Sequence, residues 1–435
     1  MIPFREALRF WLKLGFISFG GPAGQIAIMH QELVERRRWI SENRFLHALN
    51  YCMVLPGPEA TQLATYIGWI MHRTWGGLAA GLLFVLPSVF ILIALSWIYL
   101  AHGDLPVVAG LFYGVKPAVV AIVLAAAHRI GSRALKNGLM WAIAATAFVA
   151  IFALAVPFPA IVIGAGIVGY VGSRIAPARF SGAEHGSGKS YGPALIDDDT
   201  PPPAHALFTW PRLWRQAGIG LALWLATMAA LAAMFGWQGT LTQMGWFFTK
   251  AALLTFGGAY AVLPYVYQGG VEHYGWLTGQ QMIDGLALGE TTPGPLIMVV
   301  AFVGFVGGWT KEVFGPEALV HAAWAGAWVA AFFTFLPSFL FIFMGAPFIE
   351  TTHGKLSFTA PLTAITAAVV GVVLNLAVFF AIHVLWPLGK SGPFDWTSAL
   401  LGAGALVALL RYKAGVIPVI GGCALLGLAL RLAGA

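Results

Sequence analysis

Hydrophobic segments of about 20 residues follow one another along nearly the whole chain. Each is long enough to cross the hydrocarbon core of a bilayer as an α-helix. Only 9% of the residues are charged and 59% are hydrophobic, too little charge to cover the surface of a soluble protein. An all-α integral membrane protein is therefore expected. It would have about thirteen segments, at residues 4–34, 44–71, 76–100, 106–129, 137–154, 157–175, 212–236, 242–268, 281–308, 318–346, 360–386, 395–411 and 414–432.

One polar stretch, residues 176–211, interrupts this pattern near the middle of the chain. It contains Gly-Ser runs, three consecutive aspartates and three consecutive prolines, a composition typical of a flexible linker. The chain therefore divides into a first repeat at residues 1–175, a cytoplasmic linker at 176–211 and a second repeat at 212–435.

The two parts are copies of one another. Phe19-Gly20-Gly21 returns as Phe256-Gly257-Gly258, and Pro56-Gly57-Pro58 returns as Pro293-Gly294-Pro295, both at an offset of 237 residues. After an insertion, Leu86-Pro87-Ser88 matches Leu336-Pro337-Ser338 at an offset of 250. So many matches in constant register indicate an internal duplication, which is typical of transporters that place the binding site between two repeats.

Lys and Arg residues set the expected orientation, because cytoplasmic loops of membrane proteins are enriched in them. Most lie in alternate loops, and these explain the net charge of +7 without a nucleic-acid partner. Arg36–Arg38 fall on the cytoplasmic side if segments 4–34 and 44–71 are re-entrant hairpins, and outside if both segments cross fully. The sequence leaves both possibilities open. An odd number of segments separates the two repeat starts, so the repeats are expected to be inverted.

Glycine and proline breaks interrupt four of the hydrophobic segments, in two pairs related by the duplication. Such breaks free polar backbone groups, which lipid cannot satisfy, so they are tolerated where they are buried in protein or line a wet cavity. Half-helices beginning near Pro22, Pro58, Ala259 and Pro295 would point their N-terminal amides at the membrane midplane. Free amides at the positive end of a helix dipole form an anion site. The alternative is that the breaks are only kinks and close-packing positions.

Ionisable residues inside the segments are candidates for supplying positive charge to the anion site and for carrying the coupling proton. Lys116 lies near the middle of its segment and would attract a dianion; its alternative role is a structural ion pair with a carboxylate such as Glu59. Glu59 and Glu290 flank the two Pro-Gly-Pro motifs, and since burial disfavours the charged form of a carboxylate, they are candidates for proton coupling. The residues expected to bind the anion are Ser18, Gly20, Gly21, Gln25, Pro56, Gly57, Thr61, Gln62, Lys116, Thr255, Gly257, Gly258, Thr292 and Gly294.

Enzyme signatures are missing from the sequence. It has no phosphate-binding loop, no His-Glu-x-x-His and no Gly-x-Ser-x-Gly motif. Cys52 and Cys423 form neither a metal-ligand pattern nor a disulfide framework. No catalytic residue, metal or cofactor is therefore expected, and transport would draw on an ion gradient.

The same motifs resemble those of the chromate ion transporters, in the long two-domain form of that family. The resemblance covers essentially the whole chain and includes Phe16–Gly21, Leu55–Gly68, Gly114–Ala121, Thr255–Gly258 and Thr291–Pro295. It implies export of chromate from the bacterial cytoplasm, across the inner membrane, driven by the proton-motive force and conferring chromate resistance. Sulfate, a tetrahedral dianion of similar size, is the expected competitor.

The function expected is therefore a secondary active chromate exporter, by proton antiport, whose partners are chromate, sulfate as a second oxyanion, protons and membrane lipid. A homodimer is one assembly that the sequence allows. Three alternatives remain: an importer or exchanger of sulfate or another oxyanion with the same architecture, a passive anion channel, and a lipid-modifying membrane enzyme. The last would need clustered catalytic residues at one membrane face, and the sequence shows no such cluster.

Overall fold

The computed structural model describes residues 2–19, 21–103, 105–176, 191–201, 203–256, 258–352, 359–389 and 391–433. Within them it contains sixteen α-helices and no β-strand, which confirms the predicted fold class. The helices are α1 (Phe4–Ile17), α2 (Gly21–His30), α3 (Glu42–Val54), α4 (Glu59–His102), α5 (Pro106–Ala134), α6 (Gly138–Leu154), α7 (Phe158–Ile175), α8 (Trp210–Phe235), α9 (Thr240–Leu254), α10 (Ala259–Tyr267), α11 (Gly279–Thr291), α12 (Val299–Thr310), α13 (Leu319–Thr352), α14 (Thr359–Leu385), α15 (Trp396–Leu410) and α16 (Val416–Leu432).

The first two helices form a hairpin whose outer ends both lie at the N-terminal end of the molecule. There, Nη1 of Arg37, just beyond α2, lies 3.6 Å from Oε1 of Glu6 near the start of α1. At the inner end of α1, Gly15 packs directly on the backbone of Leu83, in the middle of α4. The chain then reverses and α2 begins at Gly21, whose φ of 68° favours glycine. Segment 4–34 is therefore a re-entrant hairpin.

A second hairpin follows, made of α3 and the first part of α4, with Pro56-Gly57-Pro58 at its tip. Its returning arm ends at a kink in α4, where His72 and Arg73 have non-helical backbone angles. Nε2 of His72 lies 2.8 Å from the carbonyl oxygen of Ile2, so this kink is at the N-terminal end as well. Beyond the kink α4 continues to His102 at the opposite end of the molecule.

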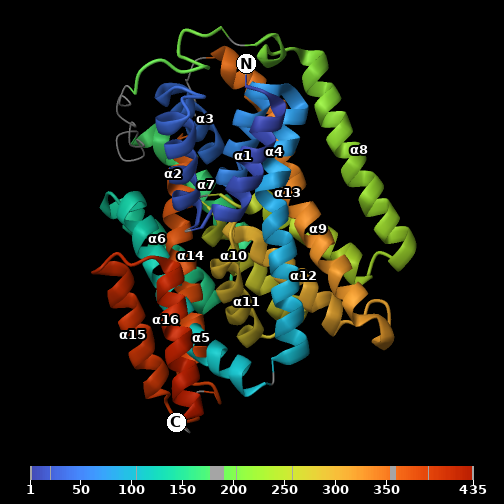
Figure 1. The fold of residues 1–435 in the computed structure, drawn as a ribbon. Coiled ribbons are helices and arrows are strands. Elements are labelled where there is room, and N and C mark those ends of the chain that lie inside the picture. Colours follow the sequence, from blue (N-terminus) through green and yellow to red (C-terminus); the bar gives the residue numbers. More distant parts are fainter. Residues whose placement is uncertain are drawn as a thin grey trace.

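The second half repeats these two hairpins from the other end. The helices α3 and α11 and the π-helical turns Gln31–Arg36 and Gln268–His273 have bounds that differ by the same 237 residues as the sequence motifs. Near the far end of α4, the hydroxyl of Tyr99 donates to Oδ2 of Asp284, near the start of α11, at 2.8 Å. The second pair of hairpins therefore enters where α4 ends, and the halves are inverted. Figure 1 shows the two termini at opposite ends, with α8 running along the side between them.

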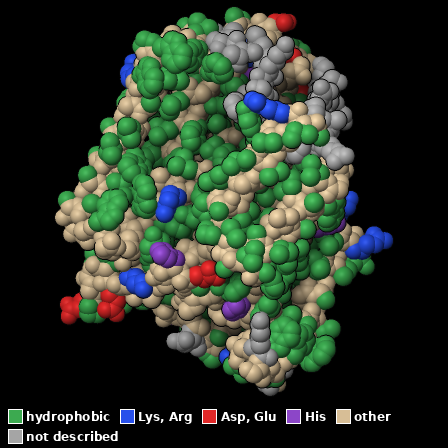
Figure 2. All heavy atoms as spheres, turned by 180° about the vertical axis from the view of Figure 1, so that it is seen from behind, with side chains coloured by type: hydrophobic (Ala, Val, Ile, Leu, Met, Phe, Trp, Pro, Cys, Tyr) green, Lys and Arg blue, Asp and Glu red, His purple; other side chains and the backbone are tan. Residues whose placement is uncertain are grey.

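Four of the thirteen expected segments thus differ from a simple crossing: 4–34, 44–71, 242–268 and 281–308 are hairpins. The physical reason is that the glycine and proline breaks end one helix at mid-depth and let the chain turn back. Six described helices are long and apolar enough to span a bilayer, and the apolar helices α6, α12, α15 and α16 are shorter. Hydrophobic side chains cover much of the face in Figure 2, and large ones such as Trp75, Leu154 and Trp210 are strongly exposed, as lipid contact requires.

Part of the linker is ordered against the first half, contrary to the flexible linker predicted from its composition. In this strap, defined as residues 191–201, Ile196 pairs with Ile40 in a β-bridge, and its backbone nitrogen and oxygen bond to Trp39 and Ser41 at 3.1 and 3.0 Å. Asp198 accepts from the hydroxyl of Ser41 at 2.5 Å. Backbone N–H groups of Ala194 and Asp198 donate to Asp197 and hold the pKa of its carboxyl below the usual value. These local bonds order the strap, and its Tyr191 and Ile196 also pack against the hydrophobic core.

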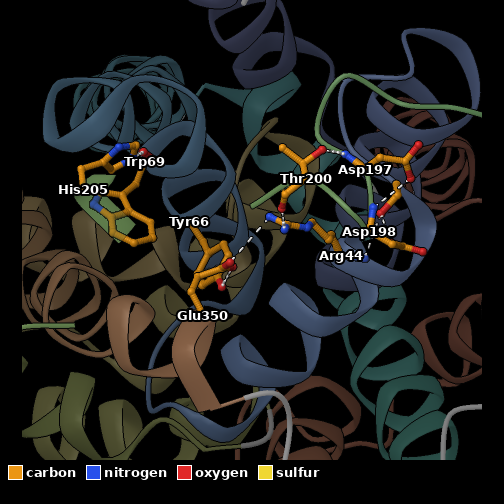
Figure 3. Close-up of polar contacts among 9 residues, drawn as sticks. Arg44, Tyr66, Trp69, Asp197, Asp198, Thr200, His205 and Glu350 are labelled. Carbon is orange, nitrogen blue, oxygen red and sulfur yellow. Dashed lines mark hydrogen bonds and ion pairs between the residues drawn. The ribbon is translucent and has the colours of Figure 1, made fainter. Parts of the chain in front are cut away.

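Arg44 joins the strap to the helices beneath it (Figure 3). Its guanidinium donates to the carbonyl oxygen of Thr200 and lies 3.7 Å from Oε2 of the buried Glu350 in α13. The hydroxyl of Tyr66, in α4, donates to the other oxygen of Glu350 at 2.5 Å. The strap, the second hairpin and α13 therefore meet at one carboxylate.

Arg44→Ala is expected to destabilise the protein by about 3 kcal/mol, because it leaves the Glu350 carboxylate buried without its cation. The measurement is the thermal unfolding midpoint of the purified protein in detergent. Arg411→Ala, which removes an exposed arginine at the end of α15, is the matched control and should leave the midpoint unchanged. Equal midpoints for both variants would show that the Arg44–Glu350 pair adds no stability.

Candidate site between the two halves

The tips of the hairpins from the two halves meet and exchange backbone hydrogen bonds. The amide of Gly57, at the first Pro-Gly-Pro tip, donates to the carbonyl oxygen of Thr255 at 2.8 Å. The amide of Gly294, at the second tip, donates to the carbonyl oxygen of Ser18 at 2.8 Å. Because Gly57 and Gly294, and likewise Ser18 and Thr255, are related by the duplication, these bonds are one contact made twice. Each Pro-Gly-Pro tip is held by the glycine break of the other half.

A serine from the long spanning helix of each half lies against the tip of the other half. Ser338, in α13, approaches Gly57, and Ser88, in α4, approaches Gly294, closely enough that a Cβ added to either glycine would lie within 3 Å of the serine side chain. These serines belong to the Leu-Pro-Ser motifs that mark the duplication. Both are buried, and neither hydroxyl has a hydrogen-bond partner among the described residues.

Four helix starts surround this junction, as the breaks predicted. The structure begins α2 at Gly21, α4 at Glu59 and α10 at Ala259, and a short 3₁₀ turn from Leu296 leads into α12. The first-turn amides of a helix have no partner within the helix and carry its positive dipole end. An anion at the junction would therefore meet these amides without needing a charged side chain.

Unpartnered polar atoms accumulate at the same place. The buried hydroxyls of Ser18 and Thr61 lack a partner among the described residues, as do one carboxylate oxygen of Glu59 and the amide oxygens of two glutamines. The amide nitrogen of Gln25 donates to the carbonyl oxygens of Ser18 and Gly294, and that of Gln62 donates to Pro56 at 2.8 Å. Leaving buried polar groups unpaired is costly, so such a cluster fits a site that is completed by a polar ligand.

The two candidate coupling carboxylates occupy different places around the junction. Glu59 begins α4, and the nearer of its carboxylate oxygens lies 3.6 Å from where a Cβ on Gly258 would be, so it faces the break of the other half. Glu290, in α11, is buried and accepts a hydrogen bond from the hydroxyl of Tyr260 in α10. At the positions related by the duplication stand Leu296 and Met53, so each carboxylate occurs on one side only.

Several sequence-predicted residues have another role, or lie outside the described residues. The hydroxyls of Thr255 and Thr292 donate to backbone carbonyl oxygens of the preceding turn, Ala251 at 2.7 Å and Gly289 at 2.9 Å. They therefore act as local capping groups. Gly20 and Gly257 lie outside the residues that the structure describes.

Lys116 does not join the break residues. Its Nζ lies 3.5 Å from Oδ2 of Asp284, so its carboxylate partner is Asp284 and not Glu59. The pair lines a separate cavity, and none of the residues lining that cavity belongs to the glycine or proline breaks. Oε1 of Glu35 lies 3.2 Å from Nδ1 of His30, whereas Glu32 pairs with Arg36 and Arg37.

Ser88 and Ser338 were not among the residues predicted for the site. Their signal was present, since both lie next to the helix prolines Pro87 and Pro337 and both are duplicated. What the sequence lacked was the packing of the two halves against each other, which places each serine at the tip of the other half.

Two inverted halves, each contributing re-entrant half-helices to a buried polar junction, define a secondary-transporter architecture. The chain belongs to the chromate transporter family, whose sequence model matches residues 5–170 and 242–428. It is 30% identical to a chromate transport protein of Cupriavidus metallidurans, over 98% of this chain and 92% of that one. It is 30% identical to a probable chromate transport protein of Synechococcus elongatus, over 93% and 89%. It is 33% identical to a chromate transport protein of Pseudomonas aeruginosa, over 83% and 77%. No solved structure matches the chain.

Proposed function

We propose that this protein exports chromate from the bacterial cytoplasm across the inner membrane, by proton antiport, and thereby confers chromate resistance. The observation that carries the proposal is the buried junction where the hairpin tips of both halves meet with unpartnered hydroxyls and helix N-termini. Its place between inverted halves is where an alternating-access carrier holds its substrate. The chromate transport proteins among its relatives supply the choice of ion.

The junction suits a tetrahedral oxyanion because it offers hydrogen-bond donors from several directions. The hydroxyls of Ser18, Thr61, Ser88 and Ser338 would donate to the oxygens of the anion, together with first-turn amides of the half-helices. Donors to a charged acceptor form shorter and stronger hydrogen bonds than donors to a neutral one. The site would therefore compensate a dianion for much of its lost hydration.

Glu59 and Glu290 are the carboxylates that we propose carry the coupling proton. Moving an empty carrier with ionised buried carboxylates would be costly, because they lack the hydration they have in water. Protonation from the outside removes that cost and permits the return step. Release of the proton to the more alkaline cytoplasm completes the exchange. Lys116, in the adjoining cavity, would supply positive charge along the path of the leaving anion.

The proposal is tested by chromate uptake into inside-out membrane vesicles containing the wild-type protein, because export from the cell is uptake into such vesicles. Uptake should be stimulated several-fold when the vesicle interior is made acidic, and a protonophore should abolish the stimulation. Excess sulfate should compete if the site recognises the shape and charge of the dianion.

Other outcomes separate the alternatives. Chromate uptake that ignores the gradient would indicate a channel or another coupling ion. Uptake of sulfate without uptake of chromate would overturn the substrate assignment. Cells that express the protein and become more sensitive to chromate would indicate import in place of export.

A further inference from the structure

A second polar cavity lies at the end of the molecule opposite the N-terminus. Its volume is about 490 Å³, and it is lined by residues near the ends of α4, α11 and α14, by α5, and by α15 and α16. The charged and titratable groups facing it are Tyr99, Tyr113, Lys116, Asp284, His383, Asp395 and Arg431. Several of the charged residues inside the hydrophobic segments therefore face this cavity, and they do not contribute to the hairpin junction.

Asp284 is held at one oxygen only. Its Oδ2 accepts from the hydroxyl of Tyr99 at 2.8 Å and lies 3.5 Å from Nζ of Lys116. Its Oδ1 is buried and has no partner among the described residues. The side chain of Asp284 is 4% exposed, whereas that of Lys116 is 27% exposed. Lys116 is therefore accessible from the cavity while its carboxylate partner lies behind it.

The second carboxylate of the cavity is fully engaged by its neighbours. Both oxygens of Asp395 accept from the hydroxyl of Tyr113 at 3.0 Å, and Asp395 also caps α15 through the backbone and hydroxyl of Ser398. Arg431 has no ion pair within the part of the chain that the structure describes. Two cations thus face the cavity, and Asp284 is the carboxylate paired with one of them, Lys116.

We infer that this cavity is a second oxyanion-binding site on the exit path, called the station below. Asp284 is a tethered competitor in this site, because the anion must displace its carboxylate from Lys116. The inference rests on the proposed function, because it assumes that an oxyanion leaves through this end. A dianion carries more charge than the carboxylate and can displace it from the ammonium group. When the anion departs, Asp284 returns to Lys116, which lowers the affinity of the station and speeds release.

The position of the Lys116–Asp284 pair supports a role on the exit path of the anion. Asp284 and Glu290 lie six residues apart on α11, about 9 Å along the helix axis. The cavity therefore begins within two helical turns of Glu290, which precedes the second Pro-Gly-Pro tip on the chain.

The inverted half has no cation at the matching position. Thr366 occupies the position that corresponds to Lys116 in the second copy, and its hydroxyl is used within α14, donating to the carbonyl oxygen of Leu362 at 2.8 Å. A cationic station on one side only makes the two ends of the path unequal in their affinity for an anion, while the proton gradient sets the direction of net transport.

The test is equilibrium binding of chromate, and separately of sulfate, to the full-length protein in detergent, by isothermal titration calorimetry. Asp284→Asn removes the competing charge and should lower the Kd about tenfold, while slowing turnover in vesicles because release becomes slower. Lys116→Gln should weaken binding, and adding it to Asp284→Asn should cancel the gain. Glu272→Gln, which removes an exposed charge outside the cavity, is the matched control and should leave the Kd unchanged.

Acidification supplies a second measurement. Protonating Asp284 removes the same charge, so the wild-type affinity for sulfate, which stays a dianion in mildly acidic solution, should rise as pH falls. The sulfate affinity of Asp284→Asn should not follow that change. Repeating the titration in a His383→Gln background removes the contribution of the one histidine that faces the cavity. An unchanged Kd and turnover in Asp284→Asn would overturn the tethered competitor while leaving chromate transport intact. Absence of oxyanion binding to the wild type would overturn the proposed function itself.

Discussion

Gly294→Ala is expected to lower chromate uptake into inside-out vesicles by at least about thirtyfold. Gly294 has φ of 97°, a backbone conformation that a side chain disfavours, and an added Cβ would lie 2.7 Å from Cβ of Ser88. Its amide also makes the 2.8 Å bond to Ser18 that holds the tip against the other half. Strain of about 1–2 kcal/mol and a lost hydrogen bond of about 1 kcal/mol together depopulate the competent arrangement by that factor.

Gly57→Ala tests whether the duplicated contact matters equally on both sides. Its φ is 124°, and an added Cβ would lie 2.4 Å from Oγ of Ser338. A similar loss is therefore expected. Gly421→Ala, in α16, is the control, because its added Cβ would meet nothing within 4 Å and uptake should stay near the wild-type rate. Wild-type uptake by both tip variants would show that the paired tips are not part of the transport site.

Glu59→Gln and Glu290→Gln are expected to abolish the stimulation of uptake by an acidic vesicle interior. Each substitution keeps the shape of the side chain and removes its ability to exchange a proton. Glu290 is buried, and Glu59 is half-buried with one buried, unpartnered carboxylate oxygen that a proton can occupy. Downhill exchange of chromate, which needs no proton, should persist in a variant whose anion site is intact.

The measurement compares uptake with an acidic interior and after addition of a protonophore, for each variant. The ratio of the two rates should fall to about one. Glu317→Gln, an exposed carboxylate near the start of α13, should keep the wild-type ratio. Persistence of the ratio in one variant would exclude that carboxylate, and persistence in both would show that the proton is carried elsewhere.

The order of these experiments matters, because the tip variants and the carboxylate variants disturb the same junction. A tip variant that loses all chromate uptake gives no information on proton coupling. A glutamine variant that still exchanges chromate shows that its anion site is assembled. The calorimetric comparison of Asp284→Asn with the wild type is independent of both, since the substituted residue lines the other cavity and not the junction.

The sequence by itself determined the membrane class, the duplication and the places where the helices break. Hydrophobic length needs no tertiary context, because a bilayer imposes a fixed thickness on every span. Pro-Gly-Pro and Gly-Gly act locally on the backbone, so helix starts near Pro22, Pro58, Ala259 and Pro295 were predictable within a few residues. The inversion followed from counting segments.

Only the tertiary structure decided how the broken ends are used. That segments 4–34 and 44–71 turn back depends on contacts such as Arg37 with Glu6 and His72 with Ile2, which join residues far apart in the chain. That Ser88 and Ser338 reach the opposite tips, and that Lys116 pairs with Asp284, depends on how α4, α5, α11 and α13 pack across the two halves. A charged or hydroxyl side chain needs a partner at hydrogen-bonding distance, and sequence spacing does not specify which helix from the other half supplies it.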